Sequence, residues 1–79
     1  MENYKRILGQ NLRKAREALQ LSQEELAHEI DIDRTYISGI ERGVRNPSLD
    51  VIAKIAQRLK TTPAALLTRP AQSRRSESA

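Results

Sequence analysis

The sequence lacks cysteine, tryptophan and phenylalanine, and its aromatic side chains are limited to Tyr4 and Tyr36. Without cysteine, disulfides and thiolate metal sites are excluded. No apolar run approaches the roughly 18 residues of a membrane-spanning helix, so we expect no membrane contact. Residues 1–3, Met-Glu-Asn, do not begin an apolar signal-peptide segment, so we expect a cytoplasmic protein. The 79 residues are enough for one small domain with an aliphatic core, which we expect dimerisation to complete.

The charge is positive overall but unevenly distributed. The formal net charge is +4 and the isoelectric point is about 10.0. Residues 1–20 have a net charge of +3, whereas residues 22–33 contain five acidic side chains and neither lysine nor arginine. Basic surface beside an acidic scaffold segment suits a polyanionic partner such as nucleic acid. From charge alone, an ordinary, mildly basic soluble domain remains the alternative.

Residues 22–43 carry the most informative pattern, two short helices joined by a tight turn. Ser22 and Glu25 have the spacing of a capping box, which predicts that the first of these helices begins at residue 23. Apolar residues then recur at helical spacing up to residue 30. Asp31 breaks this pattern, and Asp33 is placed to cap a second helix that Gly43 ends.

The predicted second helix, residues 34–42, has two different faces. Ile37 and Ile40 face inward, and the opposite face carries Arg34, Thr35, Ser38 and Arg42. This is the layout of a helix-turn-helix, whose second helix enters the major groove of DNA.

The run DRTYISGIER at 33–42, followed by RNPSL at 45–49, resembles the phage-repressor-like (Cro/C1, Xre) helix-turn-helix family. Within that family it is most similar to the controller proteins of restriction–modification systems. The resemblance covers about residues 7–68 and implies an all-α, five-helix lambda-repressor-like DNA-binding domain. The family usually has glycine at position 31. Because aspartate adopts the left-handed conformation more easily than most residues, we expect Asp31 to keep the turn with slight strain.

The remaining segments complete the five helices. A first helix over residues 4–20 carries an inward stripe of Leu8, Leu12, Ala15 and Leu19. A fourth helix over residues 49–60, capped by Ser48, turns inward Leu49, Ile52, Ile55, Ala56 and Leu59. Thr62 caps a short fifth helix at residues 64–67, and Pro63 stands at its favoured first position. We expect residues 1–68 to form the binding and dimerisation domain and residues 69–79 a disordered polar tail.

Three side chains on the second helix of the motif are candidates for reading DNA bases. The guanidinium of Arg34 suits the O6 and N7 atoms of guanine, with a phosphate contact or a plain surface position as alternatives. Thr35 can bond a base edge or pack its methyl on thymine, and Ser38 reaches either a base or a phosphate. Gly39 indicates a close approach, either to DNA or to the first helix.

A second set of residues is expected to bind the DNA backbone. Gln23 stands where helix amides attract phosphate, and the matching glutamine of the family contacts the backbone. The resemblance assigns the same role to Tyr36, Arg42, Arg45 and Asn46. Tyr36 could instead be a packing residue, and Asn46 could simply shape the loop before Pro47.

Two structural contacts are also expected. The resemblance implies a salt bridge between Arg16 and Glu41, although Arg16 could merely lie over the surface. Leu66 and Leu67 are adjacent and cannot both face one core, so we expect one of them to pack across a dimer axis with Val51.

The sequence contains no catalytic constellation, and His28 has no second metal ligand spaced to it. We therefore expect no enzyme, and no cofactor, metal or small-molecule effector. The favoured function is a homodimeric transcriptional regulator on a palindromic operator in double-stranded DNA, most similar to a controller protein acting on its own promoter. The alternative is an antitoxin, or a prophage- or plasmid-type repressor, whose fold also binds a protein partner. The polar tail offers no apolar anchors for wrapping a toxin, which disfavours the antitoxin.

Overall fold

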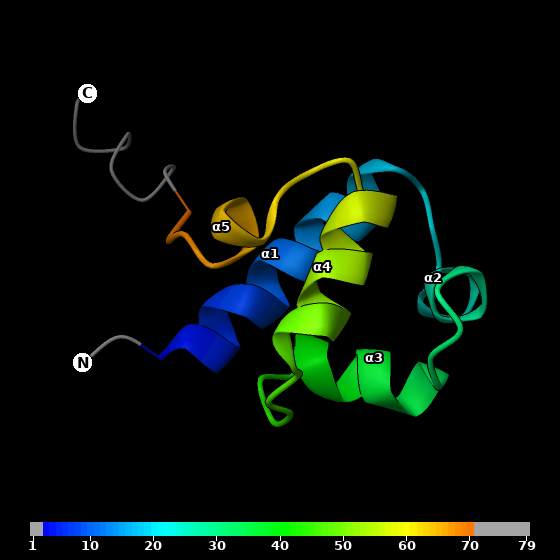
Figure 1. The fold of residues 1–79 in the computed structure, drawn as a ribbon, viewed down its shortest axis with the longest axis horizontal. Helices are drawn as coiled ribbons and strands as arrows, with labels where there is room; N and C mark the ends of the chain where they lie inside the picture. The colour runs from blue at the N-terminus through cyan, green and yellow to red at the C-terminus, as the bar shows by residue number, and fades with distance from the viewer. Residues whose placement is uncertain (1–2, 71–79) are drawn as a thin grey trace.

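The computed structural model describes residues 3–70, in which every regular element is a helix (Figure 1). The helices are α1 (Tyr4–Ala18), α2 (Gln23–Glu29), α3 (Arg34–Glu41), α4 (Leu49–Arg58) and α5 (Pro63–Leu66). The predicted all-α, five-helix architecture is confirmed. Each helix ends one or two residues earlier than the apolar spacing predicts. The predicted polar tail lies outside the described residues except for Arg69 and Pro70.

Each helix begins at a side chain that accepts a hydrogen bond from a backbone amide of its first turn. The capping residues are Asn3, Ser22, Asp33, Ser48 and Thr62. The predicted capping box is present, because Ser22 accepts from the amide of Glu25 while the Glu25 carboxylate accepts from the amide of Ser22. The helix starts are therefore fixed by local sequence, and only the cap at Asn3 was not predicted.

In each of the first four helices, the residue two positions after the last helical residue adopts the left-handed conformation. These residues are Gln20, Asp31, Gly43 and Lys60, with φ of 58°, 57°, 78° and 61°. In each case the next residue donates its amide to a carbonyl five positions earlier, as in the bond from Ile32 to Ala27 (2.9 Å). This is the Schellman arrangement. The left-handed turn predicted at Asp31 is confirmed, and it sets the direction in which α3 leaves α2.

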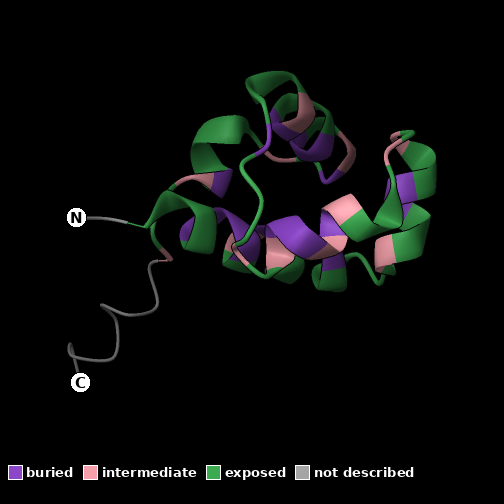
Figure 2. Ribbon diagram, turned by 90° about the horizontal axis from the view of Figure 1, so that it is seen from below, coloured by how far each residue is buried: buried purple, intermediate pink, exposed green. Residues whose placement is uncertain are grey.

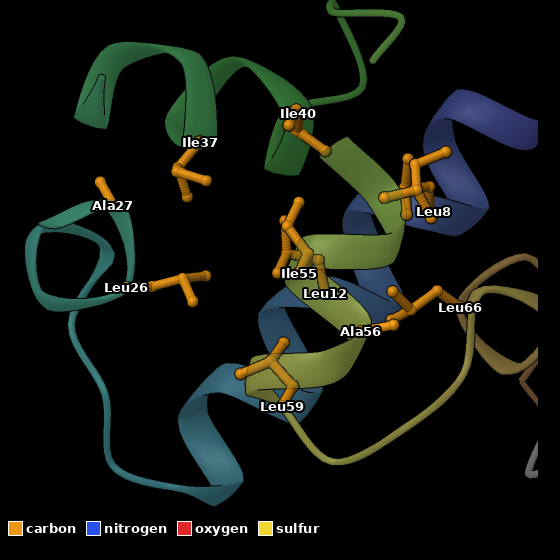
Figure 3. Close-up of a cluster of buried hydrophobic side chains, with 11 residues drawn as sticks. Leu8, Leu12, Leu26, Ala27, Ile37, Ile40, Ile55, Ala56, Leu59 and Leu66 are labelled. Atoms are coloured by element: carbon orange, nitrogen blue, oxygen red, sulfur yellow. The ribbon is translucent and has the colours of Figure 1, made fainter. Parts of the chain in front are cut away.

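Aliphatic side chains from all five helices meet in one core. Figure 3 shows Ile37 and Ile40 pointing from α3 toward Leu26 of α2 and Leu12 of α1. The remaining core residues are Leu8, Ala27, Ile52, Ile55, Ala56, Leu59 and Leu66. Figure 2 shows that buried positions follow one side of the helices and exposed positions the other. Of the adjacent pair Leu66 and Leu67, Leu66 is the core residue at only 2% exposure, so Leu67 is the one left for the predicted dimer interface.

Two residues of the predicted core are on the surface instead. Leu19 is 40% exposed and Leu49 is 74% exposed. Leu19 stands after the last residue of α1, and Leu49 is the first residue of α4. Periodicity identifies the face on which a residue lies, but it does not tell whether a neighbouring helix covers that end of the face.

Gly9 and Asn11, neither predicted to matter, join α1 to its neighbours. A Cβ atom at Gly9 would lie 2.6 Å from the carbonyl oxygens of both Ile40 and Glu41, so only glycine lets α1 approach the end of α3 this closely. The amide of Asn11 donates to the carbonyl oxygens of Leu66 and Thr68, each at 2.8 Å. These contacts hold α3 and the end of α5 against α1.

Candidate nucleic-acid interface

One face of α3 is buried and the other is open. Ile37 and Ile40 are fully buried, whereas Arg34, Thr35 and Arg42 are exposed and Ser38 is half-buried. In Figure 1, α3 lies along the lower edge of the molecule with no other helix below it. The side chains predicted to read bases are thus on a helix whose opposite face is packed against the core.

Thr35 also takes part in starting α3. Its backbone amide and its hydroxyl both donate to Oδ1 of Asp33, at 2.8 and 2.7 Å. These bonds hold the pKa of the Asp33 carboxyl below its ordinary value. The hydroxyl proton of Thr35 is engaged, so its methyl group and the hydroxyl lone pairs are what it can offer to a base.

The predicted ion pair between Arg16 and Glu41 is present and buried. Nε of Arg16 lies 2.6 Å from Oε2 of Glu41, and Nη2 lies 3.0 Å from Oε1. Arg16 also donates to the carbonyl oxygen of Leu21 at 2.7 Å, which ties it to the segment before α2. The bond to Glu41 is the main cause that raises the pKa of Arg16, so the guanidinium stays charged and paired.

Gln23 connects this ion pair to the open end of α3. Its Nε2 donates to Oε1 of Glu41 at 3.0 Å, and its Oε1 accepts a long hydrogen bond of 3.5 Å from Nη1 of Arg34. Glu41 therefore fixes which way the Gln23 amide points. An amide nitrogen carries two N–H groups, so the contact of Gln23 with Glu41 uses only one of them.

Arg45 lies against α3 instead of projecting from the loop. Its guanidinium carbon is 5.5 Å from the centroid of the Tyr36 ring, which is a cation–π contact. A Cβ atom at Gly39 would lie 2.6 Å from Cγ of Arg45. The predicted close approach of Gly39 to the first helix is therefore wrong, because the neighbour that uses its space is Arg45, whereas an approach to DNA stays a prediction.

The other predicted residues are placed as follows. Tyr36 is half-buried and packs against the core, and Asn46 is exposed next to the buried Pro47. Val51 and Leu67 are half-buried, on α4 and directly after α5. The structure thus places Gln23 and Arg45 beside α3, which itself carries Arg34.

A protein-family model described as helix-turn-helix matches residues 12–66 of the chain. The chain belongs to the helix-turn-helix family. Within the family it is 50% identical over 66 residues to control protein C.BamHI of Bacillus amyloliquefaciens, with 82% of each chain covered. The sequence resemblance to restriction–modification controller proteins is confirmed.

Solved structures of helix-turn-helix proteins give the same result. The controller protein C.AhdI from Aeromonas hydrophila superimposes with a TM-score of 0.75 at 47% identity, covering 78% of this chain and 94% of that one. The C.Esp1396I controller, solved as a tetramer with its natural 35 base-pair operator, superimposes with a TM-score of 0.72 at 30% identity, covering 84% of this chain and 87% of that one. Helices α2 and α3 are the two helices of the motif, so α3 is the recognition helix.

Several of these contacts have no direct signal in the sequence. The partnership of Gly39 with Arg45 depends on how the chain turns after α3, and Asn11 is a polar residue whose type and position do not point to a partner in α5. Gly9 could have been found, because a glycine in the middle of a predicted helix costs stability and calls for a packing reason.

Proposed function

We propose that this protein is a sequence-specific, DNA-binding transcriptional regulator that binds a palindromic operator as a homodimer in the cytoplasm. Its closest functional class is the restriction–modification controller proteins, and its activity is binding without catalysis. The observation that carries the proposal is the recognition helix α3. One side of it is fixed by Ile37, Ile40 and the buried Glu41, while Arg34 and Thr35 are exposed on the open side.

The start of α3 is the proposed base-reading end. In helix-turn-helix proteins the first residues of the recognition helix contact base edges. Arg34 is the first residue of α3, and its guanidinium can donate two parallel hydrogen bonds to guanine. Thr35 offers its methyl to thymine, and Ser38 lies one turn beyond Arg34 on the same side. We therefore propose that Arg34, Thr35 and Ser38 read the operator.

The residues around α3 are proposed to bind phosphates. Gln23 presents an N–H at the start of α2, and Arg42 and Arg45 place two positive charges at and after the end of α3. Tyr36 contributes its hydroxyl and Asn46 its side-chain amide. Such contacts fix the register of the protein on DNA and give affinity that falls with salt, but they carry no sequence information.

Dimerisation follows from the size of the site. One recognition helix contacts only a few base pairs, which is too few for specificity, so two half-sites about one helical turn apart are needed. The half-buried Val51 and Leu67 are the proposed contacts across the two-fold axis. The tetrameric C.Esp1396I complex with its operator supports binding by more than one copy.

The proposal is tested by selection from a pool of randomised DNA duplexes with the purified full chain. We expect enrichment of an inverted repeat whose half-sites are about one helical turn apart. The control is the Arg34→Ala variant carried through the same selection, which should enrich a weaker or altered consensus. Recovery of unrelated sequences with no common motif, at low salt as well as high, would refute sequence-specific binding.

A further inference from the structure

We infer that Gly39 and Tyr36 form a seat that holds Arg45 along the outer face of the recognition helix, so that Gly39 positions Arg45 for DNA. This inference rests on the proposed function and adds to it a residue that has no side chain of its own to contact DNA. Arg45 belongs to the loop after α3, but its side chain lies on the surface of α3.

The backbone after α3 brings Arg45 back over the helix. Gly43 has a φ of +78°, and its amide donates to the carbonyl oxygen of Ile40 at 3.0 Å. The amide of Val44 donates to the carbonyl oxygen of Gly39 at 3.0 Å. These two bonds reverse the chain at the helix end, so the residue that follows Val44 begins beside Gly39.

Gly39 provides the space for the Arg45 stem. Thr35, Gly39 and Arg42 follow one another at i, i+4 and i+7, so Gly39 is in the middle of the outer face of α3. It is nevertheless buried. A Cβ atom there would lie 2.6 Å from Cγ of Arg45, 3.4 Å from Nε and 3.5 Å from Cδ. The Arg45 side chain thus shields Gly39 from solvent, and any larger residue at position 39 would have to displace the Arg45 side chain.

Tyr36 holds the charged end. It lies one turn before Gly39 on α3, and its ring centroid is 5.5 Å from the guanidinium carbon of Arg45. The Tyr36 ring is itself half-buried against the core, so its position is set by the fold. Arg45 remains exposed, so its N–H groups are available to DNA from this position. A side chain ordered before binding loses less rotamer freedom on binding, which favours affinity.

The seat can be tested without DNA. In the free protein the Tyr36 ring should shift the NMR resonances of the Arg45 side-chain protons away from ordinary arginine values. We expect Tyr36→Phe to keep the shift, since the ring remains, and Tyr36→Leu and Gly39→Ala to remove it. Thermal melts accompany each variant. Gly39→Ala should melt at or above the wild-type temperature, because alanine favours a helix by up to about 1 kcal/mol over glycine. Ordinary arginine shifts in the folded wild type would overturn the seat.

A double-mutant cycle then connects the seat to DNA. Gly39→Ala and Arg45→Ala should each weaken binding to the selected operator by a similar factor, on the order of tenfold, and the double variant by no more than Arg45→Ala alone. Lys54→Ala, which removes one exposed cation from α4, is the matched charge control and should bind nearly as well as wild type. Wild-type binding by Gly39→Ala, or losses that add in the double variant, would contradict the inference. Failure of the wild type to bind any selected duplex would instead refute the proposed function and leave the NMR result standing.

Discussion

Glu41 is a single carboxylate that connects three helices. It stands on α3, accepts from Arg16 on α1 and accepts from Gln23 on α2, and its side chain is 5% exposed. A buried charge is tolerated only when a counter-charge and hydrogen-bonding groups surround it, so loss of one partner leaves the others buried and unpaired. Arg16 likewise has its three donor nitrogens engaged, two with Glu41 and one with the carbonyl of Leu21.

Replacing Glu41 with alanine should therefore destabilise the fold strongly. The substitution leaves the guanidinium of Arg16 buried without its counter-charge, which typically costs about 3–5 kcal/mol. Urea denaturation measures the free energy of unfolding. Glu17→Ala is the control, because it breaks the solvent-exposed pair with Arg13, and such pairs contribute about 0.3–0.5 kcal/mol. Equal denaturation midpoints for Glu41→Ala and wild type would show that the buried pair adds nothing.

This pair also shows what residues alone could not predict. Arg16 and Glu41 are 25 positions apart, and their partnership came only from the resemblance to a family. The same limit applies to Asn11 and to Gly39 with Arg45, where no resemblance supplied the partner. A side chain can be assigned to a face by periodicity, but its partner on another element depends on how the two elements pack.

At the scale of the element, helix starts were predictable and helix ends less so. Ser22, Asp33, Ser48 and Thr62 are capping residues recognisable from their type and spacing. The ends of α1 to α4 are made by left-handed residues, of which glycine at position 43 and aspartate at position 31 have residue types that signal this conformation. Gln20 and Lys60 carry no such signal, so the predicted α1 and α4 continued too far.

Lys60 should accordingly be a position where glycine stabilises the protein. A non-glycine residue in the left-handed region is strained, so replacing it with glycine relieves the strain and stabilises the folded state. Part of this stabilisation is offset by the greater conformational freedom of glycine in the unfolded chain. We expect Lys60→Gly to raise the free energy of unfolding by about 0.5–1 kcal/mol in urea denaturation. Lys60→Ala is the control and should bring no such gain, because alanine keeps the strain. A loss of stability in Lys60→Gly would mean that the φ of 61° costs nothing here.

The cap of α3 should make stability depend on acid pH. The pKa of Asp33 is lowered by its hydrogen bonds from Thr35, so folding favours the carboxylate. Its contribution is present above the ordinary aspartate pKa of about 4 and is lost as the pH falls through the lower folded value. Asp33→Asn keeps a capping acceptor that does not titrate. Its stability deficit relative to wild type, measured by urea denaturation from neutral pH downward, should shrink in acid. A deficit that is constant with pH would rule this contribution out.

At the scale of the whole molecule, the surface that joins two copies should be separate from α3. Leu67→Asp places a charge on the half-buried residue after α5 and should convert the dimer to a monomer in sedimentation equilibrium at tens of micromolar protein. Ala53→Asp is the control, since Ala53 is exposed on the side of α4 opposite Val51. Thermal melts confirm that each variant is folded. A strictly monomeric wild type, free and on DNA, is the outcome that removes the proposed dimer.

The overall fold was largely predictable because its elements are local. Five capped, amphipathic helices and a left-handed turn at Asp31 leave few ways to pack one aliphatic core. The molecular surface was less predictable. Leu49 has the spacing of a core residue but is exposed, and adjacency alone did not tell which of Leu66 and Leu67 is buried. Both depend on where a neighbouring helix ends, which no single segment of sequence specifies.

Arg34, at the start of the recognition helix, is the residue proposed to read a base. This role is tested by a titration of wild type and Arg34→Ala on the selected operator and on a scrambled duplex, at several salt concentrations. A bidentate arginine–guanine contact is worth about 1–3 kcal/mol of discrimination, so Arg34→Ala should weaken operator binding far more than scrambled-DNA binding. Arg45→Ala serves as the comparison and should weaken both and reduce the salt slope by about 0.9. Equal losses on both duplexes for Arg34→Ala would contradict this role and leave Thr35 and Ser38 as the base-reading residues.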